Sequence, residues 1–136
     1  AALLDDDGYR DELLGLLERF DIEYSRNVEP KIQILVALDE VPSEDSREAV
    51  EAFLEDVNET VRFHAAETTF AHGAEASIPA LCKMIVAEES VRVKNKVAEG
   101  FVRRGWSVPT ELRDAVAKAL RDTEGYRLDA TGKVVR

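Results

Sequence analysis

One segment of the chain recurs three times at intervals of 31 and 32 residues, and this repetition limits the possible fold more than any other feature. The three copies are "NVEPKIQILVAL" (27–38), "NETVRFHAAETTF" (58–70) and "SVRVKNKVAEGFV" (90–102). Each copy opens on a short polar side chain that can accept hydrogen bonds from the free N–H groups of a first helical turn: Asn27, Asn58 or Ser90. Repetition at this period is typical of stacked helix pairs, in which each pair buries its apolar face against the next.

A basic residue follows each of these caps after four positions. These residues are Lys31, Arg62 and Lys94. Helical spacing places each of them on or beside the apolar face of its helix, where the aliphatic stem can pack while the charged end reaches a neighbouring repeat. Two residues before the second and third caps stand Asp56 and Glu88. The repeating unit is therefore predicted to be an outer helix, an acidic turn, a cap, and an inner helix with a base in its first turn.

Proline and glycine residues separate seven segments with helical apolar spacing. The segments are about 9–23, 29–40, 45–56, 59–72, 76–87, 91–104 and 110–122. Strand-like alternation appears only in "YRLDATGKVVR" (126–136), where the turn residues "DATG" predict a hairpin. We expect an all-α domain over residues 1–136, with helix pairs at about 9–40, 45–72 and 76–104, a last helix at 110–122, and a C-terminal β-hairpin at 126–136. The hairpin either covers the exposed end of the last helix, offers a free strand edge to a partner, or leads into a following domain.

The stretch "DVNETVRFHAAETTF" (56–70) resembles the second half of a HEAT-type repeat, of the short kind first noted in phycobilin lyases. In that family an aspartate at the turn and an arginine early in the second helix form a ladder between stacked repeats. Asp56 and Arg62 match this pattern, the third copy has Glu88 and Lys94, and the first has only Ser25 and Lys31. The resemblance extends over about residues 9–122 and implies a short α-solenoid of about three helix pairs.

The net charge of −10 argues against non-specific binding of nucleic acid by the protein as a whole. The charge is uneven along the chain. Residues 1–82 hold 6 Lys/Arg and 20 Asp/Glu, whereas residues 83–136 hold 12 and 8. A chain with this polarity could dock an acidic segment of a partner protein on its C-terminal half or associate head to tail with a second copy, or the charges could simply solvate helix faces.

The apolar stretches are too short for a membrane span. The longest candidate, residues 78–87, contains Lys83 and falls well below the roughly 18 to 20 residues that a spanning helix needs. The single cysteine, Cys82, cannot form an internal disulfide, which suits a reducing compartment, and we expect a cytoplasmic protein. Because Cys82 lies in this apolar run, it is predicted to be a core thiol rather than a nucleophile.

The two histidines are the residues of this sequence to consider first for catalysis or metal binding. His64 stands three residues before Glu67, a spacing that could hold a metal or orient a base. A metal site needs three or four ligands, and the other histidine, His72, lies eight residues further on, beside Gly73, where a histidine commonly stabilises a helix C-terminus. The sequence therefore predicts no catalytic site, no metal site and no cofactor.

Partner binding is predicted on the inner helices, because in solenoids of the HEAT family these helices line the concave surface. In the second inner helix, His64, Glu67 and Thr68 are expected to point away from the core. In the third, a stripe interrupted by one acid is expected to bind an acidic helix or tail, unless it is an ordinary solvated face: Arg92, Lys96, Glu99 and Arg103.

The function predicted from these features is that of a non-enzymatic protein-interaction or scaffold module that binds a partner on a concave face. An accessory role in a chromophore-lyase type of enzyme is an alternative that rests on the resemblance alone. DNA binding in the manner of HEAT-like alkylpurine glycosylases is a further alternative, and the short basic stripe and the acidic first half argue against it.

Overall fold

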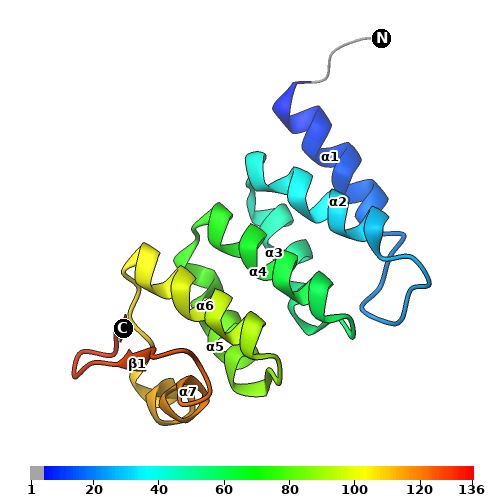
Figure 1. Ribbon diagram of the computed structural model, residues 1–136. Helices are drawn as coiled ribbons and strands as arrows, with labels where there is room; N and C mark the ends of the chain where they lie inside the picture. The colour runs from blue at the N-terminus through cyan, green and yellow to red at the C-terminus, as the bar shows by residue number, and fades with distance from the viewer. Residues whose placement is uncertain (1–4) are drawn as a thin grey trace. The chain divides into compact units, whose positions relative to one another are not determined.

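The computed structural model describes residues 5–136, which form seven α-helices and two short strands (Figure 1). The described chain divides into two compact units, one ending at His72 and the other beginning at Gly73. We call them the N-terminal unit and the C-terminal unit and describe each by itself. The predicted mainly helical class and the C-terminal hairpin are confirmed.

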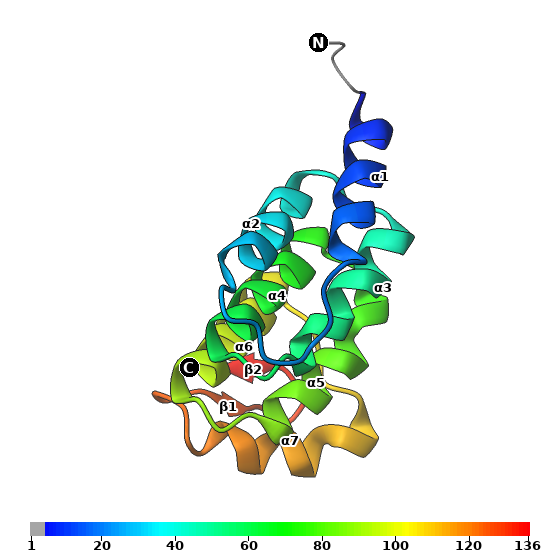
Figure 2. The same ribbon diagram turned by 90° about the vertical axis from the view of Figure 1, so that its right-hand side faces the viewer.

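The N-terminal unit consists of four α-helices, two of which end in a turn of 3₁₀-helix. The elements are α1 (Asp6–Leu17), α2 (Glu29–Ala37) with η1 (Leu38–Glu40), α3 (Glu44–Ala52) with η2 (Phe53–Glu55), and α4 (Glu59–His72). Helices α1 and α3 lie on one side of the unit and α2 and α4 on the other (Figure 2). The unit is therefore two layers of helices, with the apolar side chains between them.

The first helix lies several residues nearer the N-terminus than the sequence predicted, at Asp6–Leu17 instead of about 9–23. It begins there because the Asp5 carboxylate accepts a hydrogen bond from the Gly8 N–H at 2.7 Å. It ends at Leu17, after which the Arg19 and Phe20 N–H groups donate to the carbonyl oxygens of Leu16 and Leu17, and the chain turns at Asp21, whose carboxylate accepts the Glu23 N–H at 3.0 Å. A short acidic side chain that accepts a backbone N–H two residues later competes in this way with helical hydrogen bonding.

The predicted cap of α4 is present, and that of α2 is displaced. Asn58 Oδ1 accepts the Val61 N–H at 3.1 Å, as expected for a helix N-cap. Asn27 Oδ1 instead accepts the Glu29 N–H, and Val28 occupies the N-cap position without a side-chain cap, while α2 begins at Glu29 as the predicted segment 29–40 does. Pro30 in the first turn of α2 has no N–H to offer, which removes one of the donors that a cap would bind.

The core of the N-terminal unit is formed by aliphatic and small side chains, and one of its members corrects the sequence analysis. Leu35, Val61 and Ala65 are completely buried. Thr68, which was expected to point away from the core, is also completely buried. Its hydroxyl donates to the Leu35 carbonyl oxygen at 2.8 Å, and this hydrogen bond offsets the cost of removing the hydroxyl from water.

The C-terminal unit contains three α-helices and the hairpin. The elements are η3 (Glu75–Ser77), α5 (Ile78–Ala87), α6 (Val91–Arg104), η4 (Thr110–Leu112), α7 (Arg113–Leu120), β1 (Arg127–Leu128) and β2 (Val134–Val135). Ser90 caps α6 by accepting the Val93 N–H at 3.2 Å, as predicted. Leu81, Cys82 and Val97 are completely buried at the centre of the unit.

The hairpin is part of the C-terminal unit and packs on its helices. Its strands are antiparallel, and β1 lies against α7 while β2 lies against α6. The Val108 N–H donates to the Gly132 carbonyl oxygen at 2.8 Å, which fastens the turn of the hairpin to the segment between α6 and α7. Val134 is buried, so the hairpin packs on these helices through an apolar side chain.

Candidate functional site

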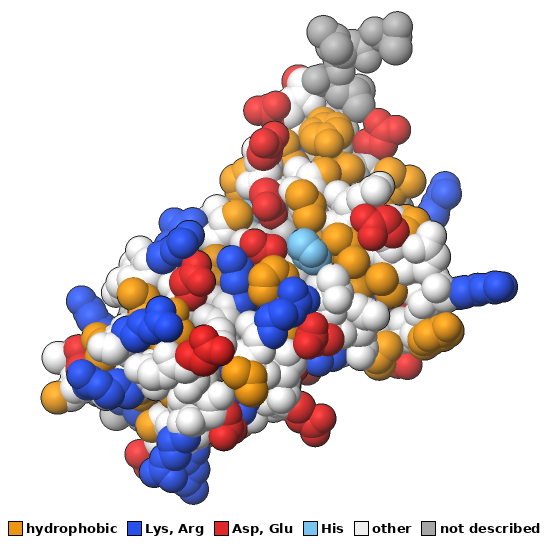
Figure 3. Space-filling view, viewed as in Figure 1, with side chains coloured by type: hydrophobic (Ala, Val, Ile, Leu, Met, Phe, Trp, Pro, Cys, Tyr) orange, Lys and Arg blue, Asp and Glu red, His pale blue; other side chains and the backbone are white. Residues whose placement is uncertain are grey.

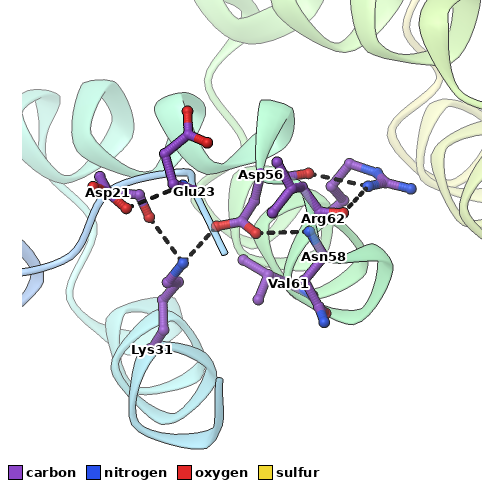
Figure 4. Close-up of polar contacts among 8 residues, drawn as sticks. Asp21, Glu23, Lys31, Asp56, Asn58, Val61 and Arg62 are labelled. Carbon is purple, nitrogen blue, oxygen red and sulfur yellow. Dashed lines mark hydrogen bonds and ion pairs between the residues drawn. The ribbon is translucent and has the colours of Figure 1, made fainter. Parts of the chain in front are cut away.

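A buried ion pair joins the first and second predicted helix pairs inside the N-terminal unit. Lys31 Nζ lies 2.7 Å from Asp56 Oδ2, and neither side chain is exposed to solvent. The same ammonium group donates to the Asp21 carbonyl oxygen at 2.8 Å, and Asp56 Oδ1 accepts the Asn58 N–H at 2.8 Å (Figure 4). The lysine that helical spacing placed on an apolar face is thus paired with a carboxylate, and the pair has a structural role.

The Arg62 side chain bonds to the backbone of the same turn. Its Nη1 donates to the carbonyl oxygens of Asp56 at 3.0 Å and Val57 at 3.2 Å (Figure 4). These carbonyls follow the last turn of η2, where acceptors are left without helical partners. In the N-terminal unit the Asp56 carboxylate therefore bonds to Lys31, and its backbone carbonyl bonds to Arg62.

A related arrangement occurs in the C-terminal unit. Lys94 Nζ lies 2.8 Å from Asp122 Oδ2, with the lysine side chain 8% exposed and the aspartate 65% exposed. Glu88 Oε1 accepts the Ser90 N–H at 3.0 Å, as Asp56 accepts that of Asn58. The sequence analysis missed Asp122. The sequence feature that points to Asp122 is its position 28 residues after Lys94, similar to the 25 residues that separate Lys31 from Asp56.

The histidine and acidic side chains of α4 form local contacts. His64 Nδ1 lies 3.2 Å from Glu67 Oε1, and both side chains are about one-third exposed. His72 Nε2 lies 2.9 Å from the Leu38 carbonyl oxygen and donates to it in the tautomer protonated at Nε2. Within residues 5–136, no three His, Cys, Asp or Glu side chains converge in a way that could hold a metal ion.

Asp39, which was not selected from the sequence, is an acid of the N-terminal unit whose pKa is raised. Burial raises the pKa of its carboxyl group above the usual value of 3.8, although the Thr68 hydroxyl partly opposes this shift. One carboxylate oxygen, Oδ1, is buried without a hydrogen-bond partner among the described residues, as is His72 Nδ1. A helical pattern could not identify Asp39, because its burial depends on packing between η1 and α4.

Of the predicted partner-binding residues of the third repeat, Arg92 and Arg103 are exposed on α6, whereas Lys96 and Glu99 are half-buried. We call Arg92, Lys96, Glu99 and Arg103 the α6 stripe. Arg103 Nη2 bonds to Glu99 Oε1 at 3.0 Å, and the Arg103 side chain is 77% exposed. Sequence reasoning missed the two valines beside the stripe, Val91 and Val102, which are 45% and 42% exposed. The face seen in Figure 3 shows Lys and Arg side chains interspersed with acidic and apolar ones.

Cys82 is a core residue, as predicted. It is completely buried, and burial raises the pKa of its thiol to about 11. A thiol with this pKa is almost entirely protonated at neutral pH and is a poor nucleophile.

Comparisons of this chain with protein-family models, with curated proteins and with solved structures find no match. The HEAT-type resemblance therefore stays a prediction. Among the described residues, no helix combines the length and the apolar character that crossing a bilayer requires.

Proposed function

We propose that the chain is a non-enzymatic interaction module and binds an acidic segment of another protein on the exposed face of α6. The observation that carries the proposal is the combination of charge and exposed apolar surface on that face. Three bases of the α6 stripe lie within about three turns of one helix. The exposed Val91 and Val102 lie one residue before Arg92 and Arg103, about 100° around the helix, so they border the stripe. Basic side chains next to exposed aliphatic ones suit an amphipathic acidic segment, which gains both ion pairs and apolar burial.

The distribution of charge along the chain favours a partner segment with negative charge. The C-terminal unit holds 12 Lys/Arg and 9 Asp/Glu, whereas the preceding 72 residues hold 6 and 19. An acidic segment approaching the chain would be repelled by the N-terminal unit and attracted to the C-terminal one, so the field orients the encounter. Glu99 lowers the positive potential of the α6 stripe and holds Arg103 in place.

We further propose that the architecture is a short HEAT-like α-solenoid. Its support is the recurrence of one arrangement: a base in the first turn of an inner helix bonds to an aspartate 25 or 28 residues later, in Lys31–Asp56 and in Lys94–Asp122. Each such pair connects one helix to the turn that follows the next helix. Repeated pairs of this kind therefore favour stacking of successive helix pairs.

The test is capture of partners from native lysate with wild-type protein and with the double variant Arg92→Glu/Arg103→Glu. A control with the same change in net charge is Lys83→Glu/Lys118→Glu, at exposed positions of α5 and α7. Circular dichroism first establishes that all three proteins are equally folded. A partner retained by wild type and control but weakened about tenfold or more in the α6 variant supports the proposal, because like charges in an interface are strongly unfavourable.

A second variant tests the sign of the charge. Glu99→Gln removes the acid from the α6 stripe and should tighten binding of the same partner. If the α6 double variant keeps every partner, or if Glu99→Gln weakens binding, the face is merely solvated and the proposed function is wrong.

A further inference from the structure

The N-terminal unit carries an apolar groove between α1 and α2, distinct from the α6 stripe. It has a volume of about 390 Å³ and is open to solvent. Its lining residues come from α1 and the turn after it and from the first half of α2: Leu13, Leu16, Arg19, Phe20, Pro30, Gln33 and Ile34. We call it the α1–α2 groove. The two helices lie side by side in Figure 1.

The apolar surface continues beyond the groove along α1. Leu16 is 40% exposed within the groove, and Tyr9 is 41% exposed further towards the start of the helix. Tyr9, Leu13 and Leu16 follow a spacing of four and three residues, so they form one row along the same side of α1, and Phe20 lies just beyond the end of that helix. Such a row, with open space above it, is the surface that a second amphipathic helix covers in helix-in-groove recognition.

The charge around the groove defines the partner. Residues 5–72 contain 6 Lys/Arg and 19 Asp/Glu, a net charge of −13. Glu12 is exposed one helical turn before Leu16 on α1, and Glu29 is exposed one turn before Gln33 on α2, so each wall carries an acid next to a lining residue. Arg19 is the one base among the lining residues. The surroundings of this apolar row therefore attract cations and repel acidic segments.

We infer that the α1–α2 groove binds the apolar face of a basic amphipathic helix of another protein. About two turns of such a helix match the row from Tyr9 to Leu16 on α1, since each turn rises about 5.4 Å. Its apolar residues cover Leu16 and Phe20, and its lysines or arginines face Glu12 and Glu29 along the rims. The groove and the α6 stripe thus take partners of opposite charge.

The probe is a synthetic peptide of about 18 residues, with leucines at helical spacing on one face and lysines on the flanks, labelled for fluorescence anisotropy. The full chain is compared with Leu16→Glu and with Val86→Glu, a control of similar exposure (47%) on α5. Saturable binding to wild type and to the control, weakened about tenfold or more by Leu16→Glu, supports the inference, because that variant loses the burial of a leucine and places a charge in the groove.

Four outcomes overturn the inference, the last of which concerns the charge of the peptide. The first is no saturable binding of the peptide, and the second is equal binding by Leu16→Glu and Val86→Glu. The third concerns the occupant: if sedimentation shows a dimer of the wild-type chain that Leu16→Glu dissociates, the groove is occupied by a second copy. A peptide in which glutamates replace the lysines must bind at least about tenfold more weakly, since like charges around the groove oppose it.

Discussion

The most informative perturbation of this fold is removal of one partner from the Lys31–Asp56 ion pair. Lys31→Met keeps most of the side-chain volume and leaves the Asp56 carboxylate buried, with the Asn58 N–H as its remaining contact. Asp56→Asn leaves the ammonium group buried against the Asp21 carbonyl oxygen and the Phe53 ring, whose centroid is 5.6 Å away. In either variant one full charge lies in the interior without a counter-charge.

The expected cost follows from the burial of both groups. Breaking a fully buried pair by removing one partner destabilises a protein by about 3–5 kcal/mol, because the other charge is left uncompensated. The double variant Lys31→Met/Asp56→Asn removes both charges and should lose much less than the sum of the two single losses. We expect an interaction energy of about 2–3 kcal/mol in the double-mutant cycle. The exposed pair Arg103–Glu99 is the control, and its cycle should give less than about 1 kcal/mol.

The assay is urea unfolding of the full chain followed by far-UV circular dichroism. Hydrogen exchange of the α2 and α3 amides shows whether the loss of stability lies in the N-terminal unit. If a single variant fails to fold, recovery of folding in the double variant gives the same information. The reasoning is refuted if each single variant loses less than about 1 kcal/mol, or if the single losses add up to that of the double variant.

Two further predictions concern backbone conformation and pH. Gly132 has φ +84°, and a Cβ there would overlap the Arg113 guanidinium group, so Gly132→Ala should destabilise the chain by at least about 1–2 kcal/mol. Gly15→Ala, in the middle of α1 with open space around it, should stabilise by about 0.5–1 kcal/mol, and urea unfolding that reverses this order contradicts the structure. Because burial raises the pKa of Asp39, its ionised form opposes folding, so Asp39→Asn should be more stable than wild type at pH 7 and lose this advantage as the pH falls towards 3.8. The Thr131 hydroxyl and the Lys133 N–H lower the pKa of Asp129, so Asp129→Asn should be less stable at pH 7 and equal to wild type once the pH falls through the folded-state value below 3.8; equal pH profiles for the two variants would contradict both assignments.

The helices were predictable because their signals are local. The caps Asn58 and Ser90 and the helices that follow them depend on spacings of a few residues, and the structure has α4 and α6 where the repeat placed them. Lys31 and Lys94 could be recognised as unusual cations on apolar faces. Their acceptors depend on the path of the loops, and the pairing of Lys94 with Asp122 was therefore not predicted.

The predictions from the sequence were wrong where tertiary contacts determine the burial of a residue or the end of a helix. Thr68 was assigned to the surface because a polar residue on a helical wheel is expected outside, and only the carbonyl of Leu35 across the unit explains its burial. The end of α1 was missed because the turn at Asp21 has no proline or glycine to mark it. The exposure of Val91 and Val102 likewise cannot be derived from periodicity, since aliphatic residues are normally counted towards the core.

The contact between Lys31 and Asp21 has a consequence for how this chain can diverge. The ammonium group bonds to the backbone carbonyl of Asp21, not to its side chain, so any residue at position 21 can supply the acceptor. The number of residues between α1 and α2 is a different matter, because it determines which carbonyl reaches Lys31. Natural variants should therefore keep the length of the connection between α1 and α2 even where residues outside the turn at Asp21 and the groove differ, the reverse of the usual tolerance of surface loops to insertions.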